Sequence, residues 1–319
     1  MERVTTLLFE LAMAFFLTYG ISRVLIRYIP MMRSSIKPEL ESVQAQKTGT
    51  PSTGGLAFCL GTTAVTLLSP ERFASSLLLP LLSLLLFGTI GLVDDLAKVH
   101  KANGDGIPSL LKLVLQGLAS ALLLVVLRRS GNLTTTLRLP FLGRQGFELG
   151  PFYLVLAWFY LMYFVNAVNI TDGLDALAGG SSLPLLILLA FFSLSSGTPF
   201  SPALIGSMVA FLRFNNKPAQ YFMGDCGSLA LGGYIALSAL MLKTEVALLV
   251  ASGLFLVEFS SSLIQIIVIR STGKKVFSIA PLHHAYELKG VEETKIVGSF
   301  TLYSWLFAMV GLLLFLVMR

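Results

Sequence analysis

Residues 75–98 read SSLLLPLLSLLLFGTIGLVDDLAK, and this stretch decides the fold class. The nineteen residues 75–93 carry no charge, and Asp94 and Asp95 follow them at once, with Lys98 three residues later. A helix needs about 20 mostly apolar residues to cross the hydrocarbon core of a bilayer. The stretch therefore predicts a membrane-spanning helix with a charged group at one membrane face.

The rest of the chain repeats this apolar pattern. Of its 319 residues, 55% are hydrophobic and 13% are charged, whereas a soluble domain carries about 25% charged residues. Because so few charges cannot cover a soluble globule, we predict an all-α polytopic membrane protein, with 1–319 forming one integral membrane domain. Ten spans are expected, at about residues 7–29, 54–68, 75–93, 110–127, 152–170, 176–194, 202–214, 229–242, 246–269 and 297–318. The second, seventh and eighth are short for a span, and a bend or a lipid groove is expected near the ninth, which carries Glu258 and Gln265.

Composition and charge weigh against several classes of function. The two cysteines are too few for a disulfide framework. The net charge of +6 comes without a run of Lys and Arg, so no nucleic-acid partner is expected. A secondary transporter remains a rival, but transporter sites lie near the membrane midplane, whereas the acidic motifs here lie at one face. No internal repeat supports a transporter either.

The positive charges predict the orientation in the membrane. With ten spans both termini lie on one side, and the opposite side carries 15 of the 23 Lys and Arg residues. Cytoplasmic loops are enriched in Lys and Arg, so the termini are expected outside the cytoplasm. All six aspartates, including Asp105, and all three histidines fall on the cytoplasmic side. One segment on the other side opposes this trend, because it carries four arginines: Arg128, Arg129, Arg138 and Arg144. Residues 134–140 of this segment could form a small hairpin.

A second polar motif, NAVNITDGLDALA, covers residues 166–178. Helical spacing places Asn166, Asn169 and Asp172 on one face. Asparagines within a membrane often only join helices, and this structural role stays an alternative. Asp172 and Asp175 have no basic residue nearby in the sequence, which favours a functional site.

Two further motifs lie on the same side of the membrane. Residues 214–228 read FNNKPAQYFMGDCGS and place Asp225 near the expected N-terminus of a helix, where exposed N–H groups favour anions. The carboxylate could also simply cap the helix. Residues 280–290 read APLHHAYELKG. His283 and His284 have no third zinc ligand at suitable spacing, so phosphate or sugar recognition is the favoured interpretation.

The stretches VDDLAK, NAVNITDGLDALA, FNNKPAQYFMGDCGSLALGG and APLHHAYELKG, in this order, resemble the polyprenyl-phosphate N-acetylhexosamine-1-phosphate transferase superfamily. The last stretch resembles the muramoyl-pentapeptide branch more than the N-acetylglucosamine-1-phosphate branch, which remains the alternative. The resemblance implies a Mg²⁺-dependent enzyme of the bacterial cytoplasmic membrane, with its catalytic loops in the cytoplasm. It also implies the reaction: UDP-N-acetylmuramoyl-pentapeptide and undecaprenyl phosphate give lipid I and UMP in peptidoglycan synthesis. The expected partners are these two substrates and the lipid bilayer, with a homodimer as an option.

The resemblance also carries residue roles. Asp94, Asp95, Asp225 and His284 would be catalytic, with Asp94 acting as a base on the lipid phosphate or as a nucleophile in a two-step reaction. Asp225 would bind Mg²⁺, Phe222 would stack on uracil and Gln265 would contact the edge of that base. The substrate-binding residues would be Lys47, Thr50, Lys98, Lys112, Asn169, Asp172, Asp175, Asn215, Phe222, Gln265 and His283.

The sequence departs from the family pattern at two places. Ala285 stands where the family has a third consecutive histidine, which leaves His283 and His284 to act alone. Residues 50–55 read TPSTGG where the family has TPTMGG. The second departure does not alter the assignment.

Overall fold

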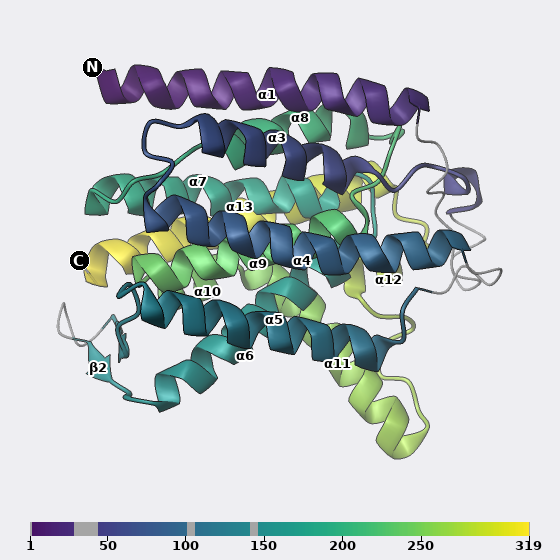
Figure 1. The fold of residues 1–319 in the computed structure, drawn as a ribbon. Helices are drawn as coiled ribbons and strands as arrows, with labels where there is room; N and C mark the ends of the chain where they lie inside the picture. The colour runs from purple at the N-terminus through teal and green to yellow at the C-terminus, as the bar shows by residue number, and fades with distance from the viewer. Residues whose placement is uncertain (1, 29–43, 101–105, 141–145, 319) are drawn as a thin grey trace.

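A computed structural model describes residues 2–28, 44–100, 106–140 and 146–318 and shows a bundle of helices with one short hairpin (Figure 1). In chain order the elements are α1 (Glu2–Tyr28), the 3₁₀ helix η2 (Ala45–Lys47), α3 (Gly54–Leu68), α4 (Ser75–His100), α5 (Ser109–Arg129), β1 (Thr136–Leu137), β2 (Phe147–Glu148), α6 (Phe152–Thr171), α7 (Leu177–Ser196), α8 (Ala203–Asn215), α9 (Gly224–Leu242), α10 (Glu245–Ala251), α11 (Gly253–Thr272), α12 (Leu282–Leu288) and α13 (Glu293–Met318). Asp105 and Arg144 lie outside the described residues.

The helices match the ten expected spans. Eight of the described helices are long and apolar enough to cross a membrane, and the shorter apolar helices α3 and α8 account for the second and seventh spans. The expected eighth span is longer than predicted because α9 begins at Gly224. The prediction of an all-α polytopic membrane protein is confirmed.

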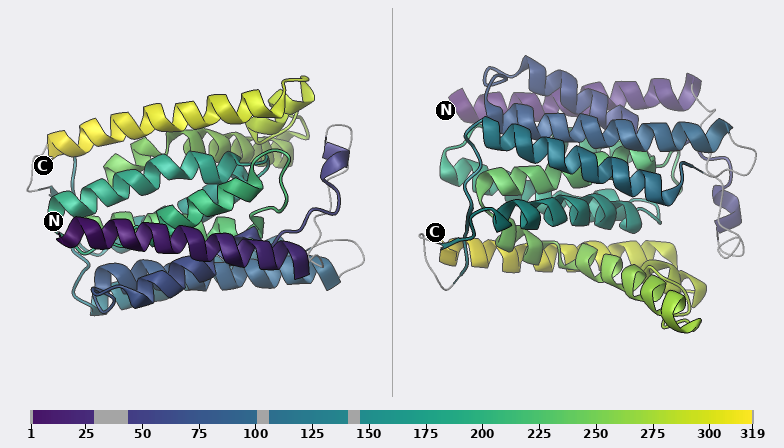
Figure 2. Two further views of the ribbon diagram at one scale, coloured as in Figure 1. Left: turned by 90° about the horizontal axis from the view of Figure 1, so that it is seen from above. Right: turned by 60° about the horizontal axis from the view of Figure 1, so that its bottom comes forward.

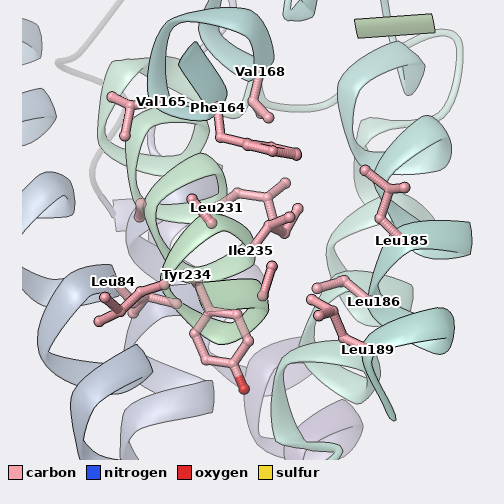
Figure 3. Packing of buried hydrophobic residues seen from close by; sticks show 14 of the residues in the cluster. Leu84, Phe164, Val165, Val168, Leu185, Leu186, Leu189, Leu231, Tyr234 and Ile235 are labelled. Carbon is pink, nitrogen blue, oxygen red and sulfur yellow. The ribbon is translucent and has the colours of Figure 1, made fainter. Parts of the chain in front are cut away.

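Helix α9 forms the centre of the bundle. Every residue from Cys226 to Leu240 is buried, and α9 packs against α4, α6, α3 and α7. Figure 3 shows Leu231 and Ile235 of α9 facing Phe164 of α6 and Leu186 of α7. Because α9 is enclosed by other helices rather than by lipid, its N-terminal end is held in a fixed place.

The expected bend in the ninth span is confirmed. Ser252 ends α10 and begins α11, with φ −84° and ψ 19°, so the apolar run from 246 to 269 forms two helices rather than one. Helix α11 leans away from the other helices (Figures 1 and 2). Its outward side chains Ile264, Ile266 and Ile267 are exposed, which suits contact with lipid.

The two ends of the bundle differ. Both termini and the hairpin lie at one end, and α12 lies at the other (Figures 1 and 2). A small hairpin is present, but residues 134–140 supply only its first strand: β1 and β2 pair antiparallel with Thr136 opposite Glu148. We call the end that carries α12 the polar end.

Candidate active site

The site begins where α4 and α9 approach each other closely. A β-carbon on Gly91 would overlap the backbone carbonyl of Asp225, so a glycine at this position lets the two helices meet. Helix α4 continues beyond the apolar stretch to His100. Asp94 and Asp95 therefore lie within the last two turns of a helix that extends past its apolar stretch, and both are buried.

Asp95 binds the N-terminus of α9. Its Oδ1 accepts a hydrogen bond from the amide of Asp225 at 3.1 Å, and its Oδ2 accepts one from the amide of Cys226 at 2.9 Å. The first amides of a helix have no partner within the helix, and a carboxylate there also interacts favourably with the helix dipole. The cap of α9 is thus Asp95 from another helix, which leaves the side chain of Asp225 available for other contacts.

Three carboxylates and two ammonium groups meet at this point. Oxygen atoms of Asp94, Asp95 and Asp225 lie within 4.8 Å of one another. Lys98 Nζ lies 2.8 Å from Asp94, 3.3 Å from Asp95 and 2.7 Å from Asp225. Lys112 Nζ lies 2.6 Å from Asp225 and 3.6 Å from Asp94. We call these five residues the aspartate cluster; its acids outnumber its bases by one.

Helix α6 adds an asparagine to the aspartate cluster. Asn169 Nδ2 donates to Asp225 Oδ1 at 2.7 Å and to Ser228 Oγ at 2.8 Å. Asn166 instead donates to Gln116 Oε1 of α5 at 2.9 Å. Only Asn169 thus reaches the aspartate cluster, whereas Asn166 joins two helices, which is the structural role considered for both asparagines.

Asp172 follows the end of α6 and its backbone leaves the helix there. Burial, together with the negative charges of Asp225 and Asp95, raises the pKa of Asp172 to about 8. A carboxyl group with such a pKa is mostly protonated at neutral pH and can donate a hydrogen bond.

The aspartate cluster has the chemistry of a magnesium site. Mg²⁺ prefers carboxylate and phosphate oxygens, and Asp94, Asp95 and Asp225 offer convergent carboxylate oxygens. Asp225 also keeps part of its side chain exposed, at 15%, so a bound substrate could share a cation with it. The residues present therefore fit the magnesium ion that the resemblance implies.

A second charged group joins four segments at the polar end. Lys47 forms ion pairs with Asp175, at 2.8 Å, and with Glu293, and Lys217 Nζ lies 3.1 Å from Glu293. Burial lowers the pKa of Lys47, but its hydrogen bonds to Asp175 and Glu293 outweigh burial and raise that pKa above the usual value. Asp175 Oδ2 also accepts from the amide of Ala219 at 3.1 Å. Each of these side chains thus binds another segment of the protein.

The two histidines of α12 lie against the turn that follows α6. His283 is fully buried, and its Nδ1 lies 3.0 Å from Glu258 of α11. His284 Nδ1 lies 3.1 Å from Glu287, which in turn accepts from Gln44 at 2.8 Å. A side chain on Gly173 would run into both imidazole rings. The histidines therefore lie next to the turn that carries Asp172 and Asp175.

The remaining expected substrate-binding residues bond to the backbone. Asn215 accepts from the amide of Ala176 and donates to the carbonyl of Tyr221, both at 2.9 Å. Gln265 bonds the backbone of Val276 and Phe277.

Of the other two expected substrate-binding residues, Thr50 lies on the segment that leads into α3 and Phe222 lies just before α9. The backbone of Phe222 bridges Pro51 and Gly54 of the segment before α3. The amide of Thr50 donates to the carbonyl of Lys47 at 3.2 Å. Thr50 and Phe222 thus make backbone contacts, whereas the side-chain amides of Asn215 and Gln265 hold loops in place.

Comparison with known proteins identifies the family. The model of glycosyl transferase family 4 matches residues 77–243. The chain is 36% identical to the phospho-N-acetylmuramoyl-pentapeptide-transferase of Oceanobacillus iheyensis, over 97% of both chains. The chain belongs to this transferase family. It is also 35% identical to the enzyme of the same name from Rickettsia canadensis, over 93% of this chain and 89% of the relative. For the enzyme of that name from Caldicellulosiruptor bescii the identity is 38%, over 84% of this chain and 83% of the relative.

Several partners of the expected residues in this family member are not evident from the sequence. The sequence shows Glu258 only as a polar residue in an apolar run, although an acid inside a membrane helix usually has a functional partner. Glu293 stands at the start of the last span and gave no signal, because acids are common in the first turn of a helix. Both pairings depend on which helices become neighbours.

Proposed function

We propose that this chain transfers phospho-N-acetylmuramoyl-pentapeptide from its UDP derivative to undecaprenyl phosphate, giving lipid I and UMP. The observation that carries the proposal is the aspartate cluster, where three carboxylates and two lysines meet at the end of an apolar helix. Its relatives carry the name of this transferase over nearly their whole length. A lipid phosphate and a soluble nucleotide can meet only where hydrocarbon borders water, and the polar end is such a place.

The proposed magnesium ion would be held by Asp225 together with Asp94 and Asp95. Bound there, it would offset the negative charge of the pyrophosphate and of the attacking phosphate. Lys98 and Lys112 supply further positive charge, and both already contact the carboxylates. Asp94, which also accepts from the amide of Ile107 at 2.8 Å, is proposed to act on the lipid phosphate, as a base or as a nucleophile.

The nucleotide and sugar are proposed to bind beside the turn at 172–175. Asn169 and Asp172 line the side of this turn that faces the aspartate cluster. His283 and His284 pack on its other side, where they would contact the sugar or a phosphate. Phe222 is half-buried next to Asp225 and offers an aromatic face on which uracil could stack.

We further propose that the polar end faces the cytoplasm of a bacterial cell and that both termini lie outside it. The excess of Lys and Arg at this end supports this orientation. The donor is a nucleotide made in the cytoplasm, so a site on that face would meet its substrate directly.

The test is UMP release by protein purified in detergent, with UDP-N-acetylmuramoyl-pentapeptide, undecaprenyl phosphate, and either Mg²⁺ or EDTA. We expect release that requires the lipid and Mg²⁺ together. Release with UDP-N-acetylglucosamine in place of the muramoyl donor would instead assign the chain to the N-acetylglucosamine branch. Release without undecaprenyl phosphate would contradict lipid-acceptor transfer altogether.

A further inference from the structure

The end of the bundle opposite the polar end carries positive charge that the proposed reaction does not use. Residues 128–150 contain four arginines and one acid, Glu148, which gives a local charge of +3. Glu148 already accepts hydrogen bonds from Thr135 and Thr136. In the described part of the chain the exposed guanidinium of Arg128 forms no ion pair. An arginine at this face lacks a protein anion, so a ligand could supply one.

Arg128 borders an apolar hollow between α5 and α6. The hollow has a volume of about 340 Å³, within the range of about 300–1,000 Å³ typical of ligand sites. Six further residues line it, all of them apolar or aromatic: Ala121, Leu124, Val125, Leu154, Val155 and Trp158. Val125 and Val155 are exposed, so the hollow opens on the outer side of the bundle, where lipid would lie.

The hollow is held in shape by its own hydrogen bond. Trp158 Nε1 donates to the carbonyl of Gly117 at 2.9 Å, and Gly117 packs directly against the indole. The indole therefore cannot easily turn to fill the space, because it would lose a partly buried hydrogen bond. The geometry favours a ligand with an apolar chain beside the indole and an anionic group near Arg128.

We propose that this hollow binds an anionic phospholipid, with one acyl chain along Val125, Val155 and Trp158 and the phosphate at Arg128. A soluble anion would gain nothing from the apolar lining. The phosphate of the acceptor lipid belongs at the other end, since Lys112 and Arg128 are sixteen residues apart on one helix, or about 24 Å. The proposal is independent of the reaction, because it uses no residue of the aspartate cluster.

The test measures lipid binding by native mass spectrometry on delipidated protein, with phosphatidylglycerol and phosphatidylcholine of identical acyl chains. We expect the wild-type protein to prefer phosphatidylglycerol. One basic residue near an anionic surface contributes about a factor of five in affinity, so Arg128→Gln should remove about that much of the preference. Arg72→Gln is the matched control, because Arg72 is exposed and stacks on Phe73 outside the hollow.

A second variant tests the apolar part of the site. Ala121→Trp should fill the hollow and weaken the binding of both lipids, while UMP release stays near that of the wild type. An unchanged lipid preference in Arg128→Gln would overturn the proposal. So would undecaprenyl phosphate that displaces phosphatidylglycerol at equal concentration, because the hollow would then hold the acceptor's tail.

Discussion

The aspartate cluster and the histidine–carboxylate pairs around α12 are built differently. In the aspartate cluster, Lys98 contacts three carboxylates and Asp225 contacts two lysines and an asparagine. Around α12, by contrast, each imidazole forms an ion pair with one carboxylate: His283 with Glu258, and His284 with Glu287, which also accepts from Gln44. The ammonium groups of the aspartate cluster are thus shared among several carboxylates, whereas the ion pairs around α12 are one-to-one.

This difference indicates separate tasks. Among carboxylates that share cations, a metal ion can replace a lysine at modest cost, and that lysine is then free to bind a phosphate. A buried and exclusive pair is costly to break, because the remaining charge has no partner. We therefore expect changes in the aspartate cluster to affect turnover first. Changes in buried polar residues with fixed partners, such as Asn215, should affect stability first.

The largest effect is expected for Asp225→Asn. Removing one charge that faces the reacting phosphates should lower the rate of UMP release about a hundredfold or more, while the thermal midpoint stays near the wild-type value. Glu292→Gln is the control, because Glu292 is an exposed acid at the same end. If purified Asp225→Asn turns over normally, Asp225 has no part in the reaction.

The next effect is on stability. Asn215→Ala leaves the amide of Ala176 and the carbonyl of Tyr221 without their partner, and both lie in buried surroundings. Such a loss costs about 1–3 kcal/mol of the free energy of unfolding, which a thermal melt in detergent would detect. Asn216→Ala serves as the control, since Asn216 is exposed. A variant that melts like the wild type but binds the donor poorly would mean that Asn215 contacts substrate.

A smaller and opposite effect is expected for Lys98→Met. The ammonium group lies within 3.3 Å of all three carboxylates, so its removal should make Mn²⁺ bind about tenfold more tightly, although turnover falls. Spin-resonance titration of EDTA-treated protein with Mn²⁺ measures this affinity. Lys274→Met, at an exposed lysine, is the control. Weaker Mn²⁺ binding would show that Lys98 organises the carboxylates rather than competing with the metal.

The last effect concerns pH. The pKa of Asp172 is raised to about 8, well above the unfolded value of about 3.9. The folded protein thus holds this proton more tightly, and stability should fall as the pH rises from about 4 to about 8. Thermal midpoints of metal-free protein between pH 6 and 9 should decline less in Asp172→Asn than in the wild type. Parallel curves would rule out this titration.

The expected site residues were only partly understood from their motifs. Asp94, Asp95, Asp225, Lys98 and Asn169 do meet, because each lies near the same end of an apolar helix. The motifs do not predict the separate roles of these residues. Asp95 holds the start of α9, and this role needs the two helices to meet at Gly91. Gln265 and Asn215 bond to backbone segments, which no spacing in the sequence indicates.

The sequence by itself determined the membrane class, the ten apolar segments and the gathering of acids at one end, because span length and charge are local properties of the chain. Only the tertiary structure decided which partner each polar group has. Asp95 and Asp225 are 130 residues apart, and Glu258 of α11 pairs with His283 of α12. Such contacts depend on how helices pack, and helix packing is set by shape along whole faces rather than by any short motif.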